Sequence, residues 1–150
     1  MIQNHREGVF LFYKTLLEYG LLWVVGGSVY YAIEFIFRGY SHWSMFVLGG
    51  ICMMFFAFQG KACNWKEPIW KQMLCGGCFV VSGEFTTGII VNKWLKLAVW
   101  DYSDMPMQLF GQICLPFALL FLILCCFGII SSGYILHWIF KEEKPQYRLR

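Results

Sequence analysis

The stretch that decides the fold runs from Ile113 to Leu136 and reads ICLPFALLFLILCCFGIISSGYIL. It contains no Asp, Glu, Lys or Arg, and it is longer than the roughly 20 apolar residues that a helix needs to cross a bilayer. Pro116 lies near its start, where the missing backbone donor does little harm to a helix. We therefore predict a transmembrane helix over this range.

Three more apolar runs precede this one, and each has the length of a membrane span. The four predicted spans are Tyr19–Phe37, Trp43–Gln59, Gln72–Val91 and Ile113–Leu136. Of the 150 residues, 59% are hydrophobic and 14% are charged, against roughly 45–50% and 25% in soluble proteins. The predicted fold class is an all-α membrane protein, a bundle of four transmembrane helices in two helical hairpins, forming a single domain over residues 1–150.

The two ends of the chain are more polar than the predicted spans. Near the N-terminus, Phe12, Leu16 and Leu17 share one helical stripe, while Lys14 and Glu18 occupy another face. This pattern predicts a short amphipathic segment ahead of the first span, which either lies at the membrane surface or leads into that span. Residues 141–150 are predicted to form a charged, mobile tail.

The distribution of Lys and Arg predicts the orientation in the membrane. Nine basic residues flank the N-terminus, the connection Gly60–Lys71 and the tail, whereas three lie on the other side. We therefore expect both termini in the cytoplasm, with Arg38–His42 and Asn92–Gln112 outside the cell membrane. The net charge of +3 is too small and too scattered to indicate nucleic-acid binding.

The cysteines and the known short motifs do not indicate enzymatic chemistry. Six of the seven cysteines fall in apolar runs, where they serve as small packing residues. Cys75-Gly-Gly-Cys78 has no second ligand pair for a zinc site. The chain also lacks a P-loop, a Gly-x-Ser-x-Gly elbow and a His-Glu-x-x-His motif. We expect no cofactor, no metal and no catalytic residue.

Glu84 is the acid that lies deepest in a predicted span, roughly 10 Å from its outer end. A charge at the bilayer centre costs at least about 2.5–3.5 kcal/mol, and no basic residue lies within four positions. One interpretation is a site for a proton, a cation or a substrate. The other is a protonated carboxyl that hydrogen-bonds a neighbouring helix, with Ser82, Thr86 and Thr87 as local partners.

Further polar residues cluster near the predicted outer face. Glu34 precedes Arg38 by four residues, which favours either an interfacial ion pair or the wall of an outward cavity. Asp101 is expected to cap a turn or to pair with Arg38, and the neighbouring aromatic residues are typical of membrane anchors. The candidate substrate- or ion-binding residues of one outward-facing pocket are Glu34, Arg38, His42, Glu84, Trp100, Asp101 and Tyr102.

Three segments also carry a family resemblance. They are Gly83-Glu84-Phe85-Thr86-Thr87-Gly88, Trp100-Asp101-Tyr102-Ser103 and Gly111-Gln112-Ile113-Cys114-Leu115, in this order. The chain resembles the putative ABC-transporter type IV family of CmpB-like small integral membrane proteins from Ser28 to Ile130, and Glu34 matches its first-helix glutamate. It departs from the family at Ser41–Phe46, where members often carry Asn-Arg-Gly-Phe-Leu-x-Gly-Pro.

The resemblance implies a permease-like transport subunit. Because four spans are few for a permease, it implies a homo-oligomer or additional subunits within the bilayer. ATP-driven transport would require a separate cytoplasmic ATPase, for which the lysine-rich region Lys61–Lys71 is the expected docking surface. Two alternatives stay open: a non-transporting scaffold whose buried acids join helices, and an enzyme acting on a lipid-linked substrate with Glu84 or Asp101 and His42 as acid and base.

Overall fold

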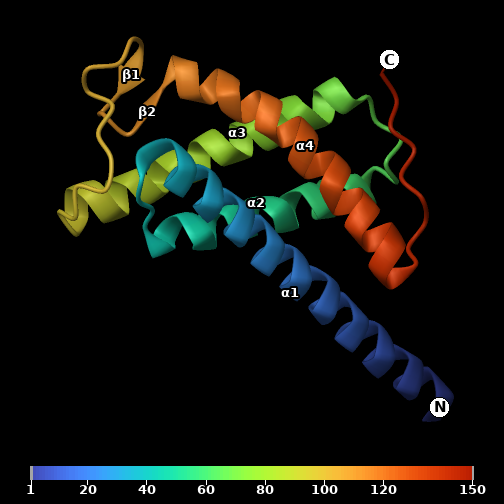
Figure 1. Cartoon of the computed structure of the whole chain (residues 1–150). Helices are drawn as coiled ribbons and strands as arrows, with labels where there is room; N and C mark the ends of the chain where they lie inside the picture. The colour runs from blue at the N-terminus through green and yellow to red at the C-terminus, as the bar shows by residue number, and fades with distance from the viewer. Residues whose placement is uncertain (1, 150) are drawn as a thin grey trace.

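The computed structural model describes residues 2–149, with side chains described from Arg6 onward. Four helices in this part of the chain are long and apolar enough to cross a membrane, which confirms the prediction of an all-α protein with four spans. They are α1 (Ile2–Arg38), α2 (Trp43–Ala62), α3 (Ile69–Gly88) and α4 (Leu115–Phe140) (Figure 1). A π-helical turn, η1 (Ile89–Trp94), extends α3, and a small ribbon of β1 (Gln108–Leu109) and β2 (Ile113–Cys114) precedes α4.

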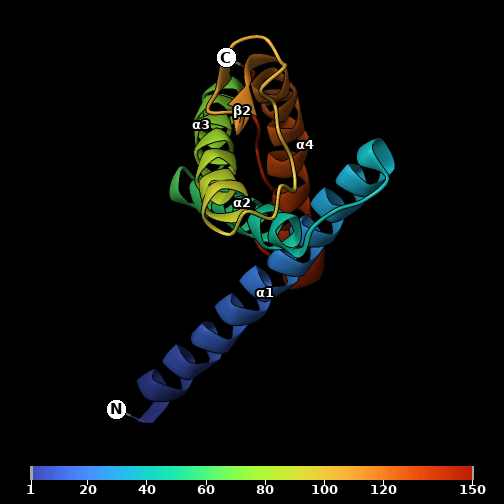
Figure 2. The ribbon, with the colours of Figure 1, turned by 90° about the vertical axis from the view of Figure 1, so that its left-hand side faces the viewer.

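Helix α1 is continuous over 37 residues, about 55 Å at 1.5 Å per residue. The prediction of a separate short amphipathic segment before the first span is therefore wrong. The physical reason is that nothing ends the helix there: it contains no proline, and the isolated glycines Gly8 and Gly20 each cost only about 1 kcal/mol relative to alanine. The N-terminal end of α1, ahead of Lys14 and Glu18, projects away from the other three helices (Figure 2).

Helices α1 and α2 cross where two glycines meet. A Cβ atom on Gly26 would lie 2.6 Å from the carbonyl oxygen of Gly49, and one on Gly49 would lie 2.8 Å from the carbonyl oxygen of Gly26. Lipid provides no hydrophobic force between helices, so such close backbone contact supplies the packing energy. Larger side chains at either position would push the two helices apart.

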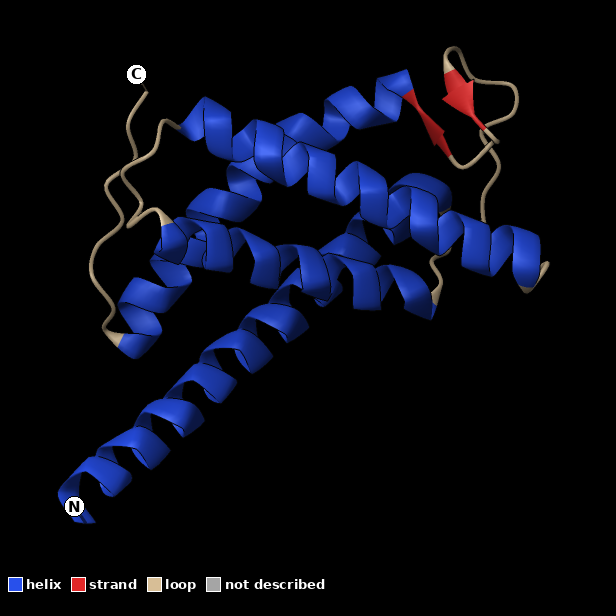
Figure 3. Ribbon diagram, turned by 180° about the vertical axis from the view of Figure 1, so that it is seen from behind, coloured by secondary structure: helices blue, strands red, loops and turns tan. Residues whose placement is uncertain are grey.

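The core lies where α2, α3 and α4 pack together (Figure 3). The ring of Phe56 in α2 is buried between two glycines: a Cβ on Gly76 of α3 or on Gly128 of α4 would approach it to 2.9 or 2.6 Å. Nearby, the rings of Phe55 and Phe79 stack with centroids 3.9 Å apart. Aromatic rings from α2 therefore fill the space that small residues leave on its neighbours.

The long connection before α4 is partly ordered by the antiparallel ribbon of β1 and β2. Leu109 pairs with Ile113 and Gln108 pairs with Cys114. Because β2 takes Ile113 and Cys114, α4 begins at Leu115, two residues later than the predicted span, with Pro116 in its first turn.

Residues 141–149 pack along the other helices, while Arg150, the last residue of the predicted mobile tail, lies outside the described residues. Tyr147 donates its hydroxyl hydrogen to the carbonyl oxygens of Ile129 and Ile130, at 3.0 and 3.2 Å. The backbone N–H of Ile69 donates to the carbonyl oxygen of Arg148 at 2.8 Å. We call residues 141–149 the C-terminal strap, since they join α4 to the start of α3.

Candidate functional site

Glu84 is buried inside the bundle, with 2% of its surface exposed. Its hydrogen-bond donor is the hydroxyl group of Tyr30, which comes from α1, whereas Glu84 belongs to α3. The expected local partners act elsewhere: Ser82 and Thr86 donate to carbonyl oxygens of their own helix, those of Cys78 and Ser82, at 2.7 and 2.8 Å. The buried acid is therefore paired across the bundle.

Sequence reasoning missed Tyr30, although a usable signal was present. Tyr30, Glu34 and Arg38 follow one another at intervals of four residues and therefore lie on one face of α1. A tyrosine one turn before an intramembrane acid–base pair is a candidate partner for a second buried acid, because its apolar ring tolerates burial and its hydroxyl still needs an acceptor.

Glu34 and Arg38 form an ion pair, with Arg38 Nη1 3.1 Å from Glu34 Oε1. The second carboxylate oxygen of Glu34 accepts a hydrogen bond from Ser41 Oγ at 3.3 Å. Arg38 Nη2 also donates to the carbonyl oxygen of Val99 at 3.2 Å, and Tyr40 donates to the same oxygen at 2.9 Å. The end of α1 is therefore held against the long connection.

Tyr102 comes from that connection and lies beside these groups. Burial raises the pKa of Tyr102 well above its ordinary value, the negative charge of Glu84 raises it further, and the positive charge of Arg38 lowers it. Its hydroxyl is accordingly protonated at neutral pH and can donate a hydrogen bond. We call Tyr30, Glu34, Arg38, Glu84 and Tyr102 the acidic site, because it combines two carboxyl groups with one guanidinium.

Three other candidate residues, His42, Asp101 and Trp100, hold local structure. His42 caps the start of α2, where its ring Nδ1 accepts from the backbone N–H of Ser44 at 3.3 Å. Asp101 accepts from the backbone N–H and the hydroxyl of Ser103, at 2.9 and 2.5 Å, and these bonds lower its pKa. Asp101 thus caps a turn, and among the described residues it forms no ion pair with Arg38.

Trp100 is buried and anchors the connection. Its indole N–H donates to the carbonyl oxygen of Gln112 at 3.0 Å. Sequence reasoning assigned no role to Asn92, which donates to Gln112 Oε1 at 2.8 Å and accepts from the backbone N–H of Val99 at 2.7 Å. Since Val99 carries the carbonyl that accepts from Arg38, the side-chain amides of Asn92 and Gln112 help to position the acidic site.

A second charged group lies at the opposite end of the bundle. Glu18 of α1 is 2% exposed, and its Oε2 lies 2.5 Å from Lys61 Nζ at the end of α2. Lys14 lies 3.6 Å from Glu18 and hydrogen-bonds Glu142 of the C-terminal strap. We call Lys14, Glu18, Lys61 and Glu142 the tail cluster. It brings both ends of the chain to the same side of the bundle as the connection 63–68.

The metal-binding side chains remain scattered. Over residues 2–149, no three His, Cys, Asp or Glu side chains come together in a group that could hold a metal ion. The acidic site therefore offers hydrogen-bond donors, carboxylates and a guanidinium, and these groups can bind a cation, exchange a proton or recognise a polar ligand.

Comparison with known proteins gives one family. Residues 10–147 match the family described as Putative ABC-transporter type IV, a range that includes both the acidic site and the tail cluster. No curated protein and no solved structure matches the chain.

Proposed function

The chain belongs to the putative ABC-transporter type IV family, and from this membership and the acidic site we propose that it is a permease-like subunit of a membrane transporter. The observation that carries the proposal is the burial of Glu84 within a span, paired with Tyr30 from another helix. An ionisable group at this depth is costly to keep, and such groups commonly mark ion, proton or substrate paths.

The charges of the acidic site suggest what it binds. Arg38 balances Glu34 through their ion pair, which leaves Glu84 as the acid without a cationic partner among the described residues. A ligand that brings a positive charge or a hydrogen-bond donor can replace the Tyr30 hydroxyl on Glu84. We infer that the transported species, or the proton coupled to it, is bound there while the aromatic ring of Tyr102 limits access from the membrane surface.

We also propose that both termini are cytoplasmic and that a separate ATPase subunit docks near Lys61–Lys71. The docking is supported by three exposed charged residues, Lys66, Glu67 and Lys71, of which Lys71 and Glu67 lie 3.3 Å apart. Lys61 is less available, because it forms an ion pair with Glu18. Affinity purification in mild detergent tests the partner. A stoichiometric ATPase is expected, lost on Lys66→Glu, and a homo-oligomer without any ATPase would contradict this docking.

The transport role is tested with Glu84→Gln, which keeps the size of the side chain and removes its acid. Cells of the native host that carry wild-type protein, no protein or the variant are compared by mass spectrometry of the compounds they take up and release. The variant is expected to reproduce the profile of cells without the protein, at normal abundance in the membrane. The matched control is Glu143→Gln, an exposed glutamate outside both the acidic site and the region Lys61–Lys71. A wild-type profile for Glu84→Gln would refute the role.

A non-transporting scaffold is the second candidate function. It is favoured by the first half of α1, where Phe10, Leu11, Phe12 and Leu17 are all exposed and leave an apolar surface free for another membrane protein. In that case Glu84→Gln lowers the melting temperature and the yield together with any cellular effect, because the acid then serves only to hold α3 to α1. We propose no enzymatic role, in keeping with the use of His42 as a helix cap.

A further inference from the structure

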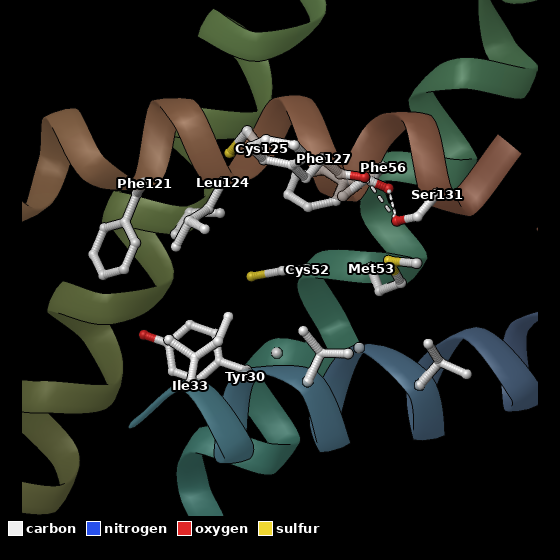
Figure 4. A pocket seen from close by; sticks show the side chains of 16 residues that line it. Tyr30, Ile33, Cys52, Met53, Phe56, Phe121, Leu124, Cys125, Phe127 and Ser131 are labelled. Atoms are coloured by element: carbon white, nitrogen blue, oxygen red, sulfur yellow. Dashed lines mark hydrogen bonds between the residues drawn. The ribbon is translucent and has the colours of Figure 1, made fainter. Parts of the chain in front are cut away.

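An apolar groove lies between α1 and α4, with α2 as its floor (Figure 4). Its volume is about 400 Å³, well above the roughly 150 Å³ of a cavity that binds benzene. Among its lining side chains only Tyr30 and Ser131 carry a hydroxyl group, and Ser131 donates its hydrogen to the carbonyl oxygen of Phe127 at 2.7 Å. The groove therefore presents hydrocarbon and sulfur along its length, with a polar group available at the Tyr30 end.

The groove exists because α1 and α4 diverge. Helix α1 touches α2 closely at Gly26 and Gly49, and the ring of Tyr30 stacks on that of Phe121, with centroids 6.4 Å apart, at the end of the groove nearest the acidic site. Beyond this contact Val29 is 53% exposed, so the flank of the groove is open. Since both walls belong to spans, this flank opens to the hydrocarbon interior of the bilayer.

The dimensions and the polarity of the groove match one kind of occupant. Along α4 the lining extends from Phe121 to Ser131, roughly 15 Å at 1.5 Å per residue, which is about half the 30 Å hydrocarbon core. The acidic site lies at the Tyr30 end, near the membrane surface, and the rest of the groove runs toward the midplane. A lipid in one leaflet has the same arrangement, with a polar head at the surface and a chain directed inward.

We propose that the groove binds the acyl chain of a membrane phospholipid whose amine-bearing headgroup is held at the acidic site. The two carboxyl groups of Glu34 and Glu84 against the single guanidinium of Arg38 favour a headgroup with an ammonium group. Tyr30 connects the two regions, because its ring lines the groove while its hydroxyl binds Glu84. The inference about the headgroup rests on the proposed function, whereas the inference about the acyl chain rests on the groove alone.

Photo-labelling tests whether the groove binds an acyl chain. Phosphatidylethanolamine with a diazirine on one acyl chain is mixed into phosphatidylcholine vesicles that contain the full-length protein, and adducts are mapped by mass spectrometry. Adducts are expected to concentrate on groove residues such as Leu124. Val29→Trp fills the space of two or more methylene groups, so labelling there should fall about tenfold. Val24→Trp is the matched control, since Val24 lies on the same helix, is 49% exposed and does not line the groove.

Labelling spread evenly over all lipid-facing helices, or unchanged by Val29→Trp, would overturn the proposal. The headgroup is tested by Glu84→Gln with the same probe and with its phosphatidylglycerol counterpart. The variant should keep chain labelling and lose the preference for the amine headgroup. If that preference persists, the acidic site and the proposed function fail, while the Val29→Trp result still decides whether the groove holds an acyl chain.

Discussion

Removing the hydroxyl of Tyr30 should destabilise the bundle, because Glu84 then loses the hydrogen-bond donor that the described residues give it. Tyr30→Phe leaves the ring stacked on Phe121 and deletes one oxygen atom. A buried polar group without a partner costs about 1–3 kcal/mol in soluble proteins. Measured hydrogen bonds between membrane helices average about 0.6 kcal/mol and reach about 1.7. We expect the free energy of unfolding to fall by about 1–2 kcal/mol.

A double-mutant cycle with Glu84→Leu, which leaves no acceptor for the Tyr30 hydroxyl, isolates this interaction from other effects of each substitution. Unfolding is followed by circular dichroism while sodium dodecyl sulfate is added to mixed micelles. Tyr31→Phe is the control, because Tyr31 is 39% exposed on the same helix and makes no side-chain hydrogen bond among the described residues. The reasoning is refuted if Tyr30→Phe matches this control, or if the two substitutions add within about 0.3–0.5 kcal/mol.

Three further predictions concern the tail cluster and the C-terminal strap. Lys61→Met leaves the buried carboxylate of Glu18 without its close partner, although Lys14 remains 3.6 Å away. Breaking a buried ion pair costs about 3–5 kcal/mol, and we expect the free energy of unfolding to fall by an amount near the lower end of this range, as measured by the same unfolding titration. The hydrogen bond from Lys14 lowers the pKa of Glu142. The carboxylate therefore stabilises the fold above its unfolded pKa of about 4.3, and this stabilisation is lost as pH falls through the folded pKa. The difference in unfolding free energy between wild type and Glu142→Gln should accordingly vanish in acid. Tyr147→Phe removes the hydrogen bonds to α4, costs about 1 kcal/mol and makes the strap more sensitive to limited proteolysis.

Each of these three has a result that would contradict it. Lys66→Met changes an exposed lysine in the connection that follows α2, and an equal loss of stability from Lys61→Met would mean that burial of Glu18 is unimportant. For Glu142, a stability difference from the Gln variant that is constant down to low pH would show that charge is not involved. For Tyr147, cleavage of the strap at the wild-type rate would show that the hydroxyl does not hold it.

The spans could be predicted from the sequence because the cost of burying a residue in lipid is a local property of short windows. The short connection after Arg38 follows from the same windows, whereas α4 continues past the predicted end at Leu136 to Phe140. The turn at Asp101 was one of two predicted roles for that residue, and it forms through atoms only two residues apart. Local chemistry of this kind is readable without a structure.

What could not be predicted depends on residues that are distant in the chain. Tyr30 and Glu84 are 54 positions apart, and although the spacing of Tyr30, Glu34 and Arg38 marks Tyr30 as a candidate partner for an acid, it does not indicate which helix supplies that acid. Lys14 and Glu18 gave an amphipathic pattern that indicated a surface segment, yet Glu18 is buried because Lys61 of another helix reaches it. The groove was also unforeseen, since it results from the angle at which α1 leaves α2 and not from the composition of either helix.

The C-terminal strap has a consequence for how the protein is made. Ribosomes synthesise a chain from its N-terminus at about 5–20 residues per second, so the 128 positions between Lys14 and Glu142 separate their synthesis by about 6–26 s. During that time α1 has already entered the membrane, the start of α3 lacks the carbonyl of Arg148, and α4 lacks Tyr147. A part of the chain that is made early is therefore held by a part that is made late.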